Sequence, residues 1–208
     1  MRAYDLCMHT TLLIAQHALA ARLTVEIARQ ITPDHLTRPT PCSDWTVRQL
    51  LDHMTTENLG FGAAARGHGA EPTAWVGDPA RQDPVADYLA ATETLISAFA
   101  EPGVLERSFA LPLLARDRQF PGELAVLMQL VDSVVHAWDL ARALDLPLTV
   151  DDDITTEVLA LCEQIPNDES RREPGAAFGP AVPHADDAPA LERIVALLGR
   201  SPAWPSSR

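Results

Sequence analysis

Three residues of this 208-residue chain have side chains and spacing suited to binding one metal ion. Asp132 and His136 are four residues apart, so on a helix they share one face. His53 lies in a separate amphipathic segment. Two imidazoles and one carboxylate leave a coordination position open, which is typical of catalytic metal sites. The sequence predicts a site for one divalent ion, at which water, a thiolate or a substrate oxygen could bind.

The same residues also allow a simpler interpretation. An Asp and a His four residues apart on a helix often form only a hydrogen bond, and a half-buried His is often satisfied by a backbone carbonyl. Without knowledge of how the helices pair, both interpretations stay open. Cys42 resembles a nucleophile at a helix start, but no His is near it in sequence, so we expect a structural, partly buried thiol.

Long helices are expected to position these residues. Apolar periodicity, proline and glycine predict helices over residues 3–31, 44–66, 84–100, 121–144, 151–165 and 187–198, with Ser43 or Asp44 capping the second. Residues 108–114 suit either a short strand or a packed loop, and residues 167–189 suit an extended, partly mobile strap. We therefore expect an all-α fold in one domain, 1–208: a four-helix bundle with long connections and extra C-terminal helices, residues 167–208 packing on it.

The apolar faces of two predicted helices place the candidate ligands. Asp132 and His136 flank an arc in the 121–144 helix, and His53 lies at the edge of an arc in the 44–66 helix. The first arc consists of Leu124, Leu127, Met128, Val131, Val135 and Trp138, and the second of Val47, Leu50, Leu51, Met54 and Phe61. Metal sites in bundles are built from inward-projecting side chains on facing helices, so the three residues can converge there.

Composition excludes several classes of function. The net charge of -13 argues against binding to nucleic acid or to an anionic membrane surface. All 16 basic residues are Arg, which excludes a Schiff-base lysine. The three cysteines are scattered without a C-x-x-C pair, so a reducing compartment is expected. We see no signal peptide and no apolar stretch of the length needed to cross a membrane, and expect a cytoplasmic protein.

Two segments resemble the signatures of a known family. Residues Thr40–His53 resemble the first signature of the mycothiol-dependent maleylpyruvate isomerase metal-binding family, in the DinB-like superfamily, and Val135–Arg142 is similar to its second. Phe178–Val182 and Leu198–Pro202 resemble an uncharacterised subgroup.

The resemblance implies a DinB-like four-helix bundle that holds one divalent ion through a His, a Glu or Asp, and a His four residues later. These positions are His53, Asp132 and His136 here. The carboxylate is Asp rather than the Glu of the namesake isomerase, and that enzyme's C-terminal domain is not evident. The resemblance therefore implies metal binding more directly than isomerase activity.

These observations lead to one hypothesis and one alternative. The hypothesis is a metal-dependent S-transferase or isomerase, in which the ion activates a low-molecular-weight thiol such as mycothiol toward an electrophilic substrate. Zinc is the first expectation, then nickel or iron, and Glu57 or Asp139 would orient an imidazole by accepting its second N–H. The alternative is a non-enzymatic metal- or small-molecule-binding bundle. A metal-free bundle and a homodimer both stay open.

Overall fold

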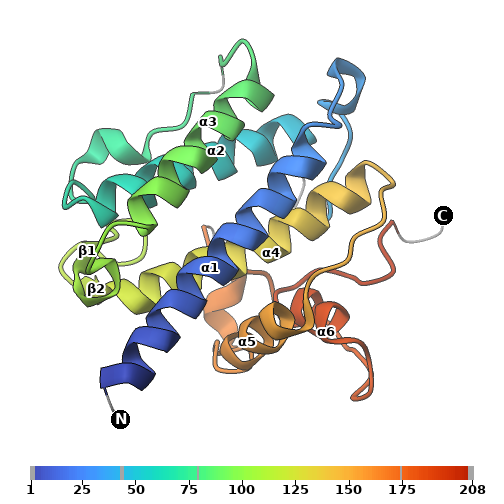
Figure 1. Cartoon of the computed structure of the whole chain (residues 1–208). Helices are drawn as coiled ribbons and strands as arrows, with labels where there is room; N and C mark the ends of the chain where they lie inside the picture. Colours follow the sequence, from blue (N-terminus) through green and yellow to red (C-terminus); the bar gives the residue numbers. More distant parts are fainter. Residues whose placement is uncertain (1–2, 43–44, 79, 174, 206–208) are drawn as a thin grey trace.

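Four long helices close into a bundle. The computed structural model describes residues 3–42, 45–78, 80–173 and 175–205, with the backbone alone for residues 3–10. The helices are α1 (Ala3–Ala28), α2 (Val47–Ala65), α3 (Pro84–Phe99) and α4 (Gly122–Ala143). Helix α1 packs against α3 and α4, and α2 packs against the same two helices (Figure 1). The predicted four-helix bundle is confirmed.

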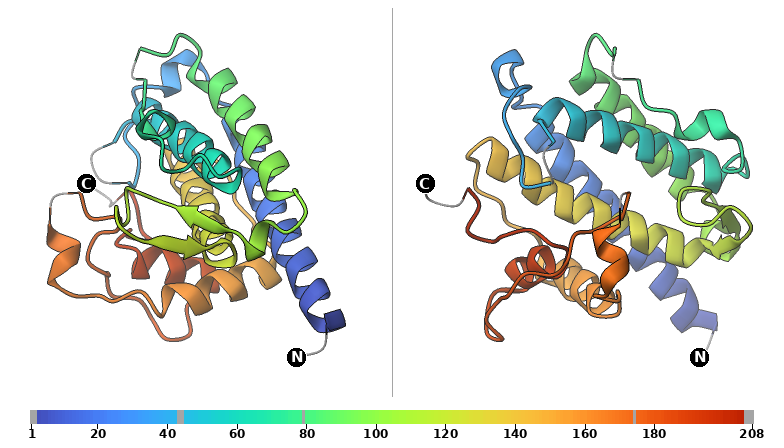
Figure 2. Two further views of the ribbon diagram at one scale, coloured as in Figure 1. Left: turned by 90° about the vertical axis from the view of Figure 1, so that its left-hand side faces the viewer. Right: turned by 180° about the vertical axis from the view of Figure 1, so that it is seen from behind.

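Two shorter helices pack outside this bundle. Helices α5 (Asp152–Cys162) and α6 (Ala190–Leu197) lie against each other, and α5 also contacts α4 (Figure 2). The long connection between them contains one 3-10 turn, Glu169–Arg172. Helix α6 starts later than predicted because Pro189 is its N-cap, and the residue before a proline is disfavoured in helical conformation.

A two-stranded antiparallel sheet precedes α4. Strands β1 (Ser108–Ala110) and β2 (Gln119–Pro121) pair with Phe109 opposite Phe120. The first strand is one of the two predicted alternatives, whereas its partner was not predicted. The backbone N–H of Gly122 then donates to the carbonyl of Arg107 at 2.7 Å, so the hairpin fixes where α4 begins.

Thr46 determines where α2 begins. Its hydroxyl accepts from the backbone N–H of Gln49, and the Gln49 side chain accepts from the backbone N–H of Thr46 at 2.9 Å. This reciprocal pair is a capping box, which satisfies two backbone donors at the helix start. The prediction that Ser43 or Asp44 caps α2 was wrong, because Thr46, two to three positions later, is the N-cap. Ser43 and Asp44 themselves lie outside the described residues.

Helix α4 is buried on nearly all sides rather than along one arc. Val126, Leu130 and Val134 are buried, whereas Leu124 and Leu127 of the predicted arc are only partly buried. Contacts with α1, α2 and α5 explain the difference. By length and composition α4 could also cross a membrane, contrary to our expectation for any segment. However, 78% of that apolar window is buried inside the protein, as in a core helix.

A buried polar network accompanies two apolar clusters in the bundle. Each of the four long helices contributes residues to both clusters. In the network, Asn58 donates to the Thr92 hydroxyl at 2.9 Å and accepts from Gln129 at 2.7 Å. Such a buried network links α2, α3 and α4 in one register. The candidate metal-ligating residues lie on two of these linked helices.

Candidate metal centre

Helices α2 and α4 bring the three predicted ligands together. His53, Asp132 and His136 each offer one ligand atom, and these atoms lie within 4.8 Å of one another. The imidazole rings of His53 and His136 meet edge to face with their centroids 5.2 Å apart. Donors bound to one ion at about 2.1 Å in tetrahedral geometry are about 3.4 Å apart. Side-chain shifts of about 1 Å would satisfy that geometry, so the residues present fit a metal ion.

The two nitrogens of His136 face two different carboxylates. Nε2 lies 3.2 Å from Oδ1 of Asp132, one helical turn earlier. Nδ1 lies 2.9 Å from Oδ2 of Asp139, one turn later. The Asp132 side chain is 26% exposed, whereas Asp139 is fully buried. Asp132 is therefore the carboxylate on the accessible side of the ring, where a ligand to an ion is needed, and Asp139 supports the ring from the interior.

The predicted supporting residues differ in their contacts. Asp139 accepts a hydrogen bond from Nδ1 of His136, which is the contact expected of a residue that orients an imidazole. Glu57 is half-buried on α2, and it interacts electrostatically with Asp132 and His136. Among the hydrogen bonds of the described residues, none joins Glu57 to an imidazole. Burial, together with the charge of Asp132, raises the pKa of Glu57 to about 8, so this carboxyl group can hold or accept a proton near neutral pH.

The two histidines of the site have opposite protonation tendencies. Burial lowers the pKa of His53 to about 4, against the attraction of Asp132, so its ring is neutral at pH 7. Burial also opposes a charge on His136, but Asp132 and the two hydrogen bonds outweigh it and raise the pKa of His136 to about 9. His136 in turn holds the pKa of Asp132 below its usual value despite burial. In the metal-free state, the protonated ring of His136 supplies the positive charge between the two carboxylates.

A second group of possible ligands already has the guanidinium of Arg200 bound to two of its members. Cys42, His136 and Asp139 also bring one ligand atom each within 4.8 Å of one another. The Arg200 guanidinium, however, lies 3.1 Å from both Cys42 Sγ and Asp139 Oδ2. Burial raises the pKa of the Cys42 thiol to about 12, against the attraction of Arg200. A neutral thiol beside a fixed guanidinium does not suit a metal ion, and the expected structural role of Cys42 is the better interpretation.

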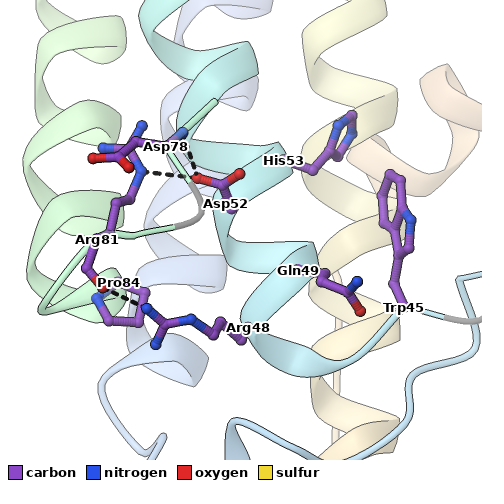
Figure 3. Close-up of a pocket in the computed structure, with 8 residues that line it drawn as sticks. All are labelled: Trp45, Arg48, Gln49, Asp52, His53, Asp78, Arg81 and Pro84. Carbon is purple, nitrogen blue, oxygen red and sulfur yellow. Dashed lines mark hydrogen bonds and ion pairs between the residues drawn. The ribbon is translucent and has the colours of Figure 1, made fainter. Parts of the chain in front are cut away.

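A pocket of about 360 Å³ opens beside His53 (Figure 3). Its lining consists of Trp45, Arg48, Gln49, Asp52, His53, Asp78, Arg81 and Pro84. The Trp45 and His53 rings, 4.8 Å apart, lie on one side of α2. On the other side Asp52 pairs with Arg81 at 2.9 Å. The pocket gives a small molecule access to His53 next to an aromatic surface.

No other histidine whose side chain the structure describes joins this group. His17 is fully buried on α1 with its ring centroid 4.7 Å from that of Phe99. Neither of its nitrogens has a hydrogen-bond partner among the described residues. The side chain of His9 lies outside the described part of the chain. His17 is thus a core residue.

The fold and this site define a class: a DinB-like helical bundle with a candidate metal centre between two facing helices. The chain matches the mycothiol maleylpyruvate isomerase N-terminal domain family over residues 17–141, which is more than half its length. It belongs to that family. The match includes His53, Asp132 and His136.

Individual relatives support the fold and leave the activity open. Two uncharacterised proteins from two strains of Mycobacterium tuberculosis are each 33% identical to this chain over 188 residues, covering 90% of it and 94% of the relative. Crystal structures of the mycothiol-dependent maleylpyruvate isomerase, and of a histidine-to-alanine mutant of that enzyme, align with a TM-score of 0.56 at 14% identity. Each alignment covers 74% of this chain and 70% of the isomerase chain. At that identity the similarity shows the shared DinB-like fold alone.

Proposed function

We propose that the protein is a divalent-metal-dependent enzyme that uses a low-molecular-weight thiol, with mycothiol the first candidate, in an isomerase- or transferase-type reaction on an electrophile. The observation that carries this proposal is the convergence of His53, Asp132 and His136 on one point. Membership of a family named for a mycothiol-dependent isomerase supports the choice of thiol. Zinc is the first candidate for the ion, because two imidazoles and one carboxylate form a common catalytic zinc set.

Each residue of the site has a definable part in this proposal. His53 and His136 would bind the ion through imidazole nitrogens, and Asp132 through a carboxylate oxygen. A divalent ion held there would act as a Lewis acid that lowers the pKa of a bound thiol. Glu57, with its pKa raised to about 8, is mainly protonated at pH 7 and can exchange a proton near neutral pH, so it is the candidate group for proton transfer beside the thiol. The Trp45 ring, 4.8 Å from that of His53, would give an apolar surface beside the ion for part of a substrate.

An open coordination position distinguishes this proposal from a structural site. Among the described residues, no fourth His, Cys or acidic side chain joins the three within 4.8 Å. The Asp132 side chain is also 26% exposed, so the group is accessible to solvent. Structural metal sites usually have four protein ligands, whereas catalytic sites keep one position for water or substrate. A non-enzymatic metal-binding bundle is the alternative, and activity decides between the two.

The test is turnover of electrophiles by metal-loaded protein with a panel of thiols. Wild-type protein is assayed with maleylpyruvate and with alkylating electrophiles, each with mycothiol, glutathione and cysteine. We expect thiol-dependent turnover with at least one pair, and its loss in His136→Ala. His68→Ala is the matched control, because this exposed residue pairs with Glu71 away from the site.

Melting temperatures complete this experiment. A catalytic site predicts that His136→Ala stays folded with a modest loss of stability, because the bundle has a substantial core of its own. If wild-type protein shows no thiol-dependent reaction and melts far lower after metal removal, the site is structural and the enzyme proposal is wrong.

A further inference from the structure

The chain after α6 returns to the candidate metal centre. Gly199 has a φ of 85°, a left-handed conformation that favours glycine, and its Cα packs against the backbone of Gly179. The backbone N–H of Arg200 then donates to the carbonyl of Val195 at 2.9 Å. These contacts end α6 and direct the Arg200 side chain inward, where the residue is only 6% exposed.

The Arg200 guanidinium donates hydrogen bonds from two nitrogens to the Asp139 carboxylate. Nη2 lies 3.1 Å from Oδ2 and Nε 3.4 Å from Oδ1 of the carboxylate. Among the described residues, its other hydrogen bonds go to the Leu198 carbonyl, at 2.9 Å, and to Cys42 Sγ, at 3.1 Å. A guanidinium fork of this kind fixes both position and orientation of a carboxylate. Arg200 therefore connects the C-terminal segment and the loop before α2 to one carboxylate on α4.

That carboxylate is the one that orients His136. Asp139 Oδ2 accepts from His136 Nδ1 at 2.9 Å, which leaves Nε2 directed at Asp132. Asp139 has no exposed surface, and a buried carboxylate without a cation would be strongly destabilised. Arg200 fixes the orientation of this carboxylate and supplies a positive charge that does not depend on the protonation of His136. The line of contacts runs from Arg200 through Asp139 to the imidazole that would bind the ion.

We propose that Arg200 is a positioning residue of the metal centre, so that the C-terminal segment Leu198–Pro202 forms part of the site rather than a cover for the bundle. The inference rests on the proposed metal-binding function. Arg200 lies 61 residues from Asp139 in sequence. Among the described residues it donates no hydrogen bond to the three candidate ligands, although its charge acts on Asp132 and His53. It acts through Asp139 by holding the His136 ring with Nε2 toward the ion. Second-layer contacts of this type typically change metal affinity by about 10- to 100-fold.

The chain supplies a matched control for this proposal. Arg171 is also buried, and it also ties together the C-terminal region. Its guanidinium donates to four backbone carbonyls, those of Ile165, Pro166, Gly179 and Leu197. Among the described residues, Arg171 makes no contact with the candidate ligands or with Asp139. An Arg171 variant thus reports the cost of loosening the C-terminal region while the guanidinium that contacts Asp139 is kept.

The experiment compares wild type, Arg200→Met, Arg200→Lys and Arg171→Met. Each metal-free protein is titrated with Zn²⁺ against a chelator and with Co²⁺, whose visible spectrum reports ligand geometry, and its melting temperature is recorded. We expect Arg200→Met to bind Zn²⁺ about 10- to 100-fold more weakly, with an altered Co²⁺ spectrum. The Zn²⁺ affinity of Arg200→Lys should lie between those of wild type and Arg200→Met, because an ammonium group cannot bind both carboxylate oxygens of Asp139 in the same way. Arg171→Met should melt lower but bind Zn²⁺ within about threefold of wild type, since it leaves the support of His136 intact.

The outcomes separate the two proposals. If both Arg200 variants bind Zn²⁺ with wild-type affinity and give the wild-type Co²⁺ spectrum, the proposed role of Arg200 is wrong, while the metal centre stands. Equal loss of affinity in Arg171→Met and Arg200→Met would show that docking of the C-terminal region alone matters, and would also overturn it. If Arg200→Met does not fold, the comparison of Arg200→Lys with Arg171→Met decides. A wild-type protein that binds neither ion overturns the metal centre, and the inference with it.

Discussion

Asp139 and His136 form a buried pair, with Oδ2 of the carboxylate 2.9 Å from Nδ1 of the imidazole. The pair determines which nitrogen of the ring is available for a metal ion, because the nitrogen that donates to Asp139 must keep its proton. Metal-binding histidines are commonly oriented in this way by a carboxylate. The opposite nitrogen, Nε2, faces Asp132 and completes the candidate ligand set with His53.

The first prediction concerns this pair. Asp139→Asn removes the carboxylate that orients His136 for binding a metal ion. It also leaves the buried Arg200 guanidinium without the carboxylate that it contacts. We expect Zn²⁺ affinity to fall by about 10- to 100-fold and the melting temperature of the metal-free protein to decrease. Chelator competition and thermal unfolding measure the two effects. The exposed Asp187→Asn variant is the control, and an Asp139→Asn protein with wild-type affinity would argue against the orienting role.

The second prediction concerns the length of the Asp132 side chain. Asp132→Asn replaces an anionic ligand by a weak neutral one, so we expect Zn²⁺ affinity to fall by at least about 100-fold. Asp132→Glu keeps the charge and extends the arm by one methylene, so affinity should stay within about tenfold of wild type. Isothermal titration of both variants is the measurement. Equal affinities for Asp132→Asn and wild type would show that Asp132 is not a ligand.

Much of this arrangement follows from local sequence patterns. Apolar periodicity and the flanking prolines and glycines predicted the four long helices, and the four-residue spacing of Asp132 and His136 predicted their shared face. The resemblance to a family then indicated His53 as their partner. The burial of α4 on nearly all sides was not predicted, because an apolar arc read from one helix does not show how many neighbours that helix has.

Long-range polar contacts could not be predicted. Nothing in the residues around Arg200 indicates that its guanidinium reaches a carboxylate 61 positions earlier. Likewise, Asn58 and Gln129 are polar residues in apolar helices, but only the folded bundle shows that they bond to each other. The available signal was the presence of such residues where burial is expected, since buried polar groups need partners.

The third prediction concerns the pH dependence of metal binding. The pKa of His136 is raised to about 9 in the metal-free protein, so below that pH the ring must release the Nε2 proton before it can bind an ion. We expect Zn²⁺ affinity to rise with pH by about tenfold per unit between pH 6 and 9, with about one proton released per ion. Titration calorimetry in buffers of different ionisation enthalpy counts the proton. An affinity that does not change over this range would contradict the assigned protonation state.

The fourth prediction concerns His17 and stability. Burial lowers the pKa of His17 to about 3, from an ordinary value of 6.5. The unfolded chain therefore binds a proton that the folded chain does not, and stability is lost as the pH falls from about 6.5 toward 3. His17→Leu removes two unsatisfied buried nitrogens and this acid sensitivity. We expect it to raise the free energy of unfolding by about 1–2 kcal/mol at pH 7, and by more at pH 5.

Thermal and urea unfolding at pH 5 and pH 7 measure this effect, with the exposed His68→Leu as the control. A destabilised His17→Leu protein would mean that the imidazole has a partner that stabilises the fold.

The number of metal ions per chain tests the central claim most directly. Protein purified without chelator, and protein stripped and reloaded with Zn²⁺, Ni²⁺ or Fe²⁺, are analysed for metal beside His53→Ala and His136→Ala. Three ligand atoms within 4.8 Å predict about one ion per wild-type chain and less than about a tenth of that in either variant, with all three proteins folded. Wild-type protein that stays near zero after reloading, or variants that keep a full equivalent, would contradict a metal centre formed by His53, Asp132 and His136.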